Sequence, residues 1–390
     1  MANNKHFSKW VACWGNATSI ADQQPAMYAK DITLRYPVKM CFDGSRLRLR
    51  FSNFTGTEPV TLSTVTAARA LENDMNIDAA TLHALTFNNG MSSVTIQPGQ
   101  EITGDEFDYE VTAGETLNVS IYFENFTQMN SGVSVSGPLS KGYYSSGNFA
   151  SDAVLPIKLT RGTNWFYFIN TIDIFTAEEN HAVICYGDSI TAQSWPEHLV
   201  LFAKEEGINN VSIIRRAVSG TRILREYDNI TYAAYGRKGE TRFPLEMNVA
   251  GADTVIIHHG INDIIHPVGV DVNPFRPWED LPTVEELIEG VRNFYLPIAR
   301  EKNKNVYSAT LLPIYGWRTY ADFREELVSG FNKWLRTSDE FDGCVDFAAV
   351  VCDPENRFAL ESSCDSGDHL HPSEKGHKLT AKLNLNGRYL

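Results

Sequence analysis

Two short segments far apart in the chain carry residue types that could perform nucleophilic catalysis. Ser189 follows Gly187 and Asp188 at the end of an apolar run, and Asp368 and His371 lie three residues apart near the C-terminus. A histidine takes the proton of a serine at neutral pH when a nearby carboxylate holds its ring in the correct tautomer. The pattern therefore predicts Ser189 as a nucleophile, His371 as its base and Asp368 as the residue that orients this base.

His369 is the rival of His371 for the role of base. An aspartate and a histidine separated by one residue tend to project apart, whereas Asp368 and His371 can fold back toward each other within one turn. We therefore favour His371. Two simpler interpretations stay open, a serine that only turns the chain and a surface loop with solvated histidines, because short motifs often match by chance.

Attack by a serine on an acyl carbon creates an oxyanion, which needs hydrogen-bond donors. Gly220 follows one apolar run and permits the close approach of a backbone N–H, and Asn262 follows the next run and offers a side-chain amide. Each residue alone is more often ordinary turn chemistry. Their positions at the ends of successive predicted strands favour a single pocket.

The elements that must position these residues change in type near residue 180. Before it, apolar residues alternate with polar ones in residues 46–51, 117–123 and, less cleanly, 81–87, which is typical of strands with one buried face. Turn residues separate these runs, and residues 137–148, rich in Gly, Ser and Tyr, are interpreted as a long loop. Residues 1–178 are therefore expected to form an antiparallel, jelly-roll-like β-sandwich domain.

After Asn180, continuous apolar runs are typical of strands in a parallel sheet that is covered by helices. These runs occupy residues 181–189, 210–218, 253–260, 306–314 and 344–351. Helical patterns lie between them, and one of these places Phe323, Leu327, Phe331 and Trp334 on one face. Residues 179–390 are therefore expected to form an open α/β domain that binds ligands beyond the carboxyl ends of its strands.

Two of the predicted helices have the sequence of a capping box at their start. Ser194 and Glu197 provide the first, and Thr283 and Glu286 provide the second.

Composition excludes several classes of partner. The chain has 390 residues, more than a single hydrophobic core usually contains, so two domains are expected. Its net charge of -14 repels phosphate backbones and anionic lipid surfaces, so neither nucleic acid nor a membrane is expected as a partner. No run approaches the roughly 18 apolar residues of a membrane span, and the N-terminus lacks the pattern of a secretory signal. Six cysteines without a C-x-x-C pair indicate reduced thiols. We expect a cytoplasmic protein, although removal of a signal peptide would leave the same N-terminus.

Three histidines cluster near the end of the third apolar run, at His258, His259 and His266. A metal site is conceivable there, since imidazole is a common zinc ligand. Adjacent residues of a strand face opposite ways, however, so His258 and His259 cannot easily bind one ion. A packing or pocket-lining role is expected instead.

The motifs together resemble the four conserved blocks of the SGNH hydrolases, also called GDSL esterases. The resemblance spans residues 181–390 and rests on Gly187-Asp188-Ser189, Gly220, Gly260-x-Asn262-Asp263 and Asp368-x-x-His371. It implies a flavodoxin-like three-layer α/β/α domain, no metal or organic cofactor, and ester hydrolysis through an acyl-enzyme. It also implies an oxyanion hole made by the amides of Ser189 and Gly220 and the side chain of Asn262, with Asp368 and His371 completing a triad.

Two positions depart from the pattern that the resemblance implies. Many members have an asparagine shortly before the second-block glycine, where this chain has Arg215-Arg216-Ala217, and Ile190 stands where many members have leucine. The exchange of leucine for isoleucine conserves volume.

The N-terminal half has a second resemblance, to the β-rich leader of two-domain GDSL esterases of bacterial type. It rests on Trp10-x-x-x-Trp14-Gly15, Leu34-Arg35 and Leu49-Arg50-Phe51-Ser52-Asn53 followed by Gly56. The large aromatic side chains here are expected in the core rather than on a sugar-binding face.

Three functions follow as expectations. The first is an esterase that removes a short acyl group, most simply acetyl, from a small hydroxylated molecule such as an acetylated oligosaccharide. The second keeps the chemistry but acts on a lysophospholipid or an acyl thioester, and the third is a carbohydrate-binding protein without turnover. A chain-length series separates the first two, because each buried CH₂ contributes about 0.8 kcal/mol.

Overall fold

The computed structural model describes residues 6–20, 28–72, 74–226, 235–270, 276–387 and 389. Internal contacts divide the chain into two compact units. The first comprises Met1–Ala182 with Asn209–Ile214, and the second comprises Val183–Ile208 with Arg215–Leu390.

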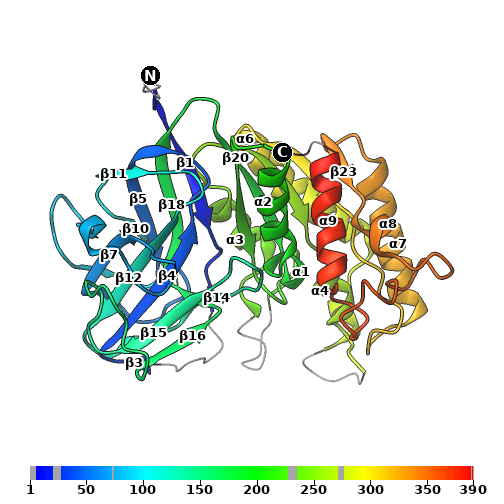
Figure 1. Cartoon of the computed structure of the whole chain (residues 1–390). Coiled ribbons are helices and arrows are strands. Elements are labelled where there is room, and N and C mark those ends of the chain that lie inside the picture. Colours follow the sequence, from blue (N-terminus) through cyan, green and yellow to red (C-terminus); the bar gives the residue numbers. More distant parts are fainter. Residues whose placement is uncertain are drawn as a thin grey trace. The chain divides into compact units, whose positions relative to one another are not determined.

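The first unit consists mainly of two antiparallel sheets (Figure 1). One has the order β1 (Lys9–Gly15), β18 (Ile169–Thr176), β5 (Gly44–Ser52) and β10 (Glu101–Thr103), with β11 (Phe107–Val111) also on β5. The other has the order β16 (Thr160–Thr163), β15 (Gly142–Ser146), β4 (Ile32–Lys39), β12 (Thr116–Phe123), β7 (Thr64–Arg69) and β8 (His83–Ala84).

Short elements complete this unit. The structure contains β2 (Ser19–Ile20), β3 (Tyr28–Ala29), β6 (Val60–Leu62), β9 (Val94–Ile96), β13 (Thr127–Gln128), β14 (Ser131–Ser134), β17 (Trp165–Tyr167) and a 3₁₀ turn at Ala79–Thr81. The predicted antiparallel, strand-rich N-terminal region is confirmed. Its alternating strands bury one face, as in β5, where Leu47, Leu49 and Phe51 are fully buried.

Two details of this region were predicted wrongly. The strand expected over residues 81–87 shrinks to the two residues of β8, and the loop expected over 137–148 contains β15. β15 pairs with β4 on one side and β16 on the other, and Gly142 packs closely against Tyr36 of β4. Neighbouring strands thus impose an extended backbone on a segment with little alternation of its own, since strand preference depends on context.

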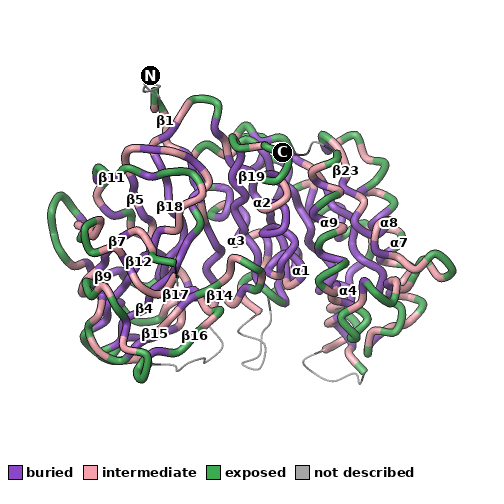
Figure 2. Tube along the Cα trace, in the orientation of Figure 1, coloured by how far each residue is buried: buried purple, intermediate pink, exposed green. Residues whose placement is uncertain are grey.

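The second unit is built on a five-stranded sheet. Its order is β20 (Val211–Ala217), β19 (His181–Gly187), β21 (Ala252–His258), β22 (Asn305–Ala309) and β23 (Gly343–Val345), and β22 runs parallel to both of its neighbours. This 2-1-3-4-5 order is that of the flavodoxin-like folds. β19, β20 and β21 are buried along most of their length, which explains their continuous apolar sequences (Figure 2).

Helices flank this sheet. They are α1 (Ser189–Ala192), α2 (Trp195–Glu205), α3 (Gly239–Glu246), α4 (Ile261–Ile265), α5 (Val284–Gly290), α6 (Leu296–Glu301), α7 (Asp322–Thr337), α8 (Phe347–Val351) and α9 (Glu374–Asn386), with a π-helical turn at Val291–Tyr295 and a 3₁₀ turn at Trp278–Asp280. In one group α9 packs against α2 and α8, and in another α5 packs against α7. The predicted α/β fold of this half is confirmed.

The two predicted capping boxes have different outcomes. Thr283 and Glu286 form one at the start of α5. Ser194 makes no capping bond at the start of α2, because its hydroxyl donates to Glu374 at 3.3 Å. Glu197 pairs with a buried arginine, Arg215.

The buried face of α7 is rotated from the predicted one. Arg324, Val328, Phe331 and Leu335 are buried, so Phe331 alone is shared with the predicted set. Among the helices that the structure describes, none is long and apolar enough to cross a membrane.

Candidate active site

Ser189 is the first residue of α1, directly after the carboxyl end of β19. Asp188 caps this helix, since its Oδ1 accepts a hydrogen bond from the N–H of Ile190 at 3.1 Å. Gly187 must lack a side chain, because a Cβ there would lie 2.3 Å from the carbonyl oxygen of His258. The sharp turn between strand and helix therefore presents the Ser189 hydroxyl at the edge of the sheet.

Three predicted residues form one hydrogen-bonded chain. The Ser189 Oγ lies 2.9 Å from His371 Nε2, and His371 Nδ1 lies 2.6 Å from Asp368 Oδ2. With the ring proton on Nδ1 facing the carboxylate, Nε2 accepts the hydrogen bond of the serine hydroxyl. The chain thus provides a route for the serine proton to an oriented imidazole.

The loop that carries this histidine is held by its own hydrogen bonds. Asp368 Oδ1 accepts the N–H groups of Leu370 at 3.0 Å and His371 at 2.8 Å. Burial raises the pKa of Asp368, but the hydrogen bonds from the side chain and N–H of His371 outweigh this effect and leave the pKa below its ordinary value. The carboxylate is therefore ionised at neutral pH.

The rival histidine has a partner of its own. His369 Nδ1 lies 2.6 Å from Asp365 Oδ2, and the residue has a φ of 65°, in the left-handed region. The structure therefore brings His371 to Ser189 and pairs His369 with a different carboxylate.

The two further candidates, Gly220 and Asn262, lie on segments that are bonded to each other. Asn262, on α4, donates a hydrogen bond from Nδ2 to the carbonyl of Thr221 at 3.1 Å. Gly220 has a φ of 81°, and a Cβ at this residue would lie 2.2 Å from the ring of Tyr235. An amide nitrogen carries two protons, so Asn262 holds this loop and retains a second donor.

Asp263 ties the same segments together from the next position of α4. Its two oxygens accept the N–H groups of Ile223 at 2.7 Å and Leu224 at 3.0 Å. Burial raises its pKa to about 6 even though these two bonds oppose the shift.

Sequence reasoning missed a buried ion pair behind the nucleophile. Arg215 Nη2 lies 3.0 Å from Glu197 Oε1, and Arg215 Nη1 donates to the carbonyls of Ala192 and Gln193 at 3.4 and 3.3 Å. The arginine thereby supports the end of the helical turn that begins with Ser189. The sequence marked Arg215 as a departure from the pattern of the SGNH hydrolases, but it did not identify the partner of Arg215, Glu197, which lies 18 residues earlier in the chain.

The clustered histidines face different neighbours, as expected for adjacent strand residues. His259 Nδ1 bonds the hydroxyl of Tyr295 at 2.8 Å and its Nε2 bonds Thr221 Oγ1 at 2.9 Å. His258 packs against the ring of Phe347. Burial lowers the pKa of His259 to about 3, so this side chain is neutral and serves as a packed hydrogen-bonding group.

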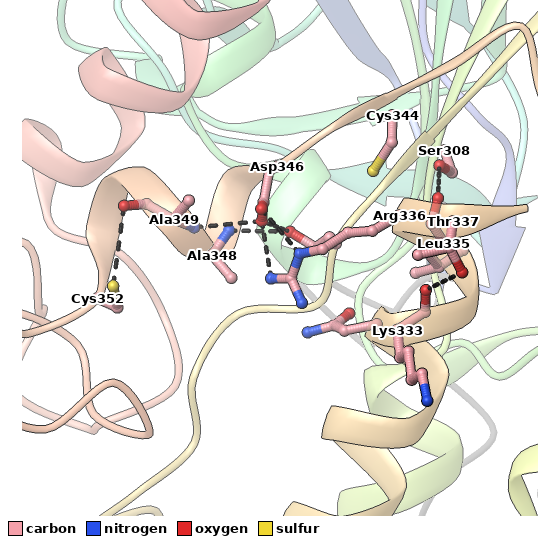
Figure 3. Close-up of polar contacts among 12 residues, drawn as sticks. Ser308, Lys333, Leu335, Arg336, Thr337, Cys344, Asp346, Ala348, Ala349 and Cys352 are labelled. Atoms are coloured by element: carbon pink, nitrogen blue, oxygen red, sulfur yellow. Dashed lines mark hydrogen bonds and ion pairs between the residues drawn. The ribbon is translucent and has the colours of Figure 1, made fainter.

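A cavity of about 440 Å³ lies away from this chain of residues, beside α7 and α8. Neither Ser189 nor His371 lines it. Arg336 and Asp346 in its wall bond each other at 2.8 and 2.9 Å (Figure 3). Asp346 also accepts Thr310 Oγ1 at 2.9 Å, so these charges stabilise the packing of the two helices.

Comparison with known proteins agrees with the fold and the motifs. Residues 185–379, half of the chain, match the GDSL-like lipase/acylhydrolase family, and the chain belongs to this family. Its members hydrolyse esters, so the chain is of the ester hydrolase class. A search of curated proteins found no match.

Several solved structures are similar to the chain. A GDSL-like lipase from Bacteroides thetaiotaomicron is 18% identical over 54% of this chain and 88% of its own, with a TM-score of 0.38. A lipase/acylhydrolase from Enterococcus faecalis is 19% identical over 54% and 95%, with a TM-score of 0.36. A variant of an acetyl-xylooligosaccharide esterase from Geobacillus is 19% identical over 53% and 93%, also with a TM-score of 0.36.

Proposed function

We propose that the protein is a serine esterase in which Ser189 is the nucleophile, His371 its general base and Asp368 the residue that orients His371. The observation that carries this proposal is the 2.9 Å approach of Ser189 Oγ to His371 Nε2, with Asp368 on the other ring nitrogen. Nucleophile, base and orienting carboxylate within hydrogen-bond distance define the activated serine of acyl transfer.

The proposed reaction has two halves. Ser189 Oγ attacks the ester carbonyl while His371 Nε2 takes its proton, and the oxyanion accepts hydrogen bonds from the amides of Ser189 and Gly220 and from Asn262 Nδ2. His371 then returns the proton to the departing alkoxide, leaving an acyl-serine. Water repeats the sequence with His371 as base, and the carboxylic acid leaves.

The proposed substrate is a short-chain ester, most simply the acetyl ester of a small hydroxylated molecule such as an oligosaccharide. The strongly acidic chain, with a net charge of -14, is a poor match for an anionic lipid surface and favours a small polar alcohol. A lysophospholipid or an acyl thioester is the alternative, and a carbohydrate-binding protein without turnover is the third possibility.

We further propose that residues 179–390 form the catalytic domain and that residues 1–178 form a β-sandwich domain belonging to the same enzyme.

Hydrolysis of acetyl, butyryl and octanoyl nitrophenyl esters tests the proposal. Ser189→Ala is expected to lower kcat by roughly 10⁴-fold or more, as for removal of other triad nucleophiles. Ser329→Ala, on the exposed surface of α7, is the matched control. Comparable activity of wild type and Ser189→Ala, or an inactive wild type, would overturn the proposal. A preference for octanoyl would keep the nucleophile and favour the lysophospholipid or thioester alternative.

A further inference from the structure

Trp317 borders the side of the active site from which a leaving group would depart. Its ring makes an edge-to-face contact with the imidazole of His371, with 6.4 Å between centroids. In the proposed mechanism His371 protonates the leaving oxygen, so the alcohol part of the ester lies next to this imidazole. Trp317 and the residue after it therefore lie on the alcohol side of the site.

Arg318 adds a positive charge at this border. Its guanidinium carbon lies 4.7 Å from the centroid of the Trp317 ring, and its side chain is exposed. Within the part of the chain that the structure describes, Arg318 forms no hydrogen bond or ion pair. The planar guanidinium has five N–H donors in a fork that matches a carboxylate, and stacking on Trp317 leaves this fork open to a ligand.

The backbone beside Arg318 is fixed to the same helix that carries Asn262. Thr319 Oγ1 donates to the carbonyl of Ile265 at the end of α4 at 3.0 Å. Arg324 Nε donates to the carbonyl of Thr319 at 2.5 Å. Because these bonds hold the segment before any ligand arrives, binding at Arg318 costs little backbone ordering.

The residue that follows α4, His266, lies in a positively charged environment. Burial is the largest cause that lowers its pKa to about 3, and the charges of Arg222, Arg276, Arg318 and Arg324 lower it further. Positive charge thus gathers around this end of α4, in a chain whose net charge is -14.

Arg222 and Arg324 make contacts within the protein. Arg222 forms an ion pair with Asp280. Arg324 donates to the carbonyls of Ile264 at 2.8 Å and Pro267 at 3.0 Å. Their charges still contribute to the local potential, which attracts anions to a site in an otherwise acidic protein.

We infer that Arg318 is a specificity determinant that binds an anionic group, most simply a carboxylate, on the alcohol part of the ester. The inference rests on the proposed function. It narrows the substrate class from acetylated sugars in general to acetylated acidic sugars, such as an acetylated uronic acid. A phosphate on the alcohol shares the same chemistry and forms a separate arm of the test.

The test compares esters that differ in one charged group. Acetylated glucuronic acid, acetylated glucose and acetylated glucose phosphate carry the same acyl group. The wild type is expected to have the higher kcat/KM for the glucuronic acid ester than for the glucose ester. Arg318→Gln is expected to lower the ratio of these two values about tenfold, mainly through KM, since a hydrogen bond to a charged group contributes about this factor.

Two further variants sharpen the result. Arg318→Lys keeps the charge without the planar fork and is expected to give an intermediate ratio. Arg300→Gln removes an exposed arginine just before β22, at the opposite end of the sheet strands from Ser189, and is expected to leave the ratio unchanged.

The outcomes separate this inference from the proposed function. If the wild type hydrolyses both sugars, Ser189→Ala hydrolyses neither, and Arg318→Gln leaves the ratio as in the wild type, the inference is overturned and the esterase stands. A wild type that prefers the glucose ester also overturns it. A preference for the phosphate ester that Arg318→Gln removes supports the anion site and assigns phosphate as its ligand.

Discussion

Arg215 of β20 and Glu197 of α2 form a buried ion pair, with 3.0 Å between Nη2 and Oε1. The side chains are only 6% and 11% exposed, so water cannot replace either partner. Because the guanidinium also bonds the carbonyls at the end of α1, this pair joins the sheet, α2 and the turn that carries Ser189.

Removal of one partner should destabilise the fold strongly. Arg215→Met leaves Glu197 buried without its cation, and we expect the free energy of unfolding to fall by about 3–5 kcal/mol. Urea unfolding at pH 7 measures this loss. The double variant Arg215→Met, Glu197→Leu should recover part of it, because no unpaired charge remains. A single variant as stable as wild type would show that the pair contributes nothing.

The two neighbouring aspartates should differ sharply in their effect on catalysis. Asp368→Asn removes the carboxylate that holds the tautomer of His371, and kcat should fall on the order of 10⁴-fold. Asp365→Asn makes the same change at the partner of His369, whereas Ser189 is bonded to His371, so a far smaller change is expected. Steady-state hydrolysis of the acetyl ester measures both. Equal losses of kcat in the two variants would contradict the choice of His371 over His369 as the general base.

Asn262 should contribute to the transition state rather than to binding. Asn262→Ala is expected to lower kcat by about 10²–10³-fold with little change in KM, as for loss of one oxyanion donor. Asn332→Ala is the matched control, since Asn332 is also buried and also donates to a carbonyl, that of Leu311 at 2.8 Å. Both variants should lose thermal stability, but only the first should lose kcat per folded molecule. Similar kcat values would remove Asn262 from the oxyanion hole.

Asp188 should make stability depend on pH. Burial is the main cause that raises its pKa from 3.8 to about 7, and its Oδ2 has no hydrogen-bond partner among the described residues. At a pH between these two pKa values, Asp188 keeps its proton in the folded chain and has lost it in the unfolded chain. The contribution of Asp188 to the free energy of unfolding therefore falls as pH rises from about 4 to 7.

Asp188→Asn keeps the oxygen that caps α1 and cannot ionise. Relative to wild type, the variant should gain stability as pH rises through this window, on the order of 4 kcal/mol by pH 8, because about three pKa units correspond to this free energy. Urea unfolding of both proteins at pH 4.5, 6 and 8 tests this difference, in which the contributions of all other groups cancel. A difference that is constant with pH would contradict the raised pKa.

Much of the fold was predictable because its causes are local. Alternating residues such as Leu47, Leu49 and Phe51 predicted strands with one buried face, and continuous apolar runs predicted the parallel sheet. The prediction failed where neighbours decide conformation, as in β15, whose pairing with β4 and β16 overrides a loop-like composition. Glu197 was likewise assigned to a helix cap because its true partner, Arg215, lies on another element.

The sequence by itself determined the chemical types and the local pairing of the candidate site. Asp368 and His371 meet because three residues of loop suffice to bring their side chains together, and Asp188 caps α1 from the adjacent position. Only the tertiary structure decided that Ser189 lies 2.9 Å from a histidine 182 residues away, and that His369 turns to Asp365 instead. Sheet order and helix packing set such distances, because long-range contacts depend on how all the elements pack and not on the spacing of any one segment.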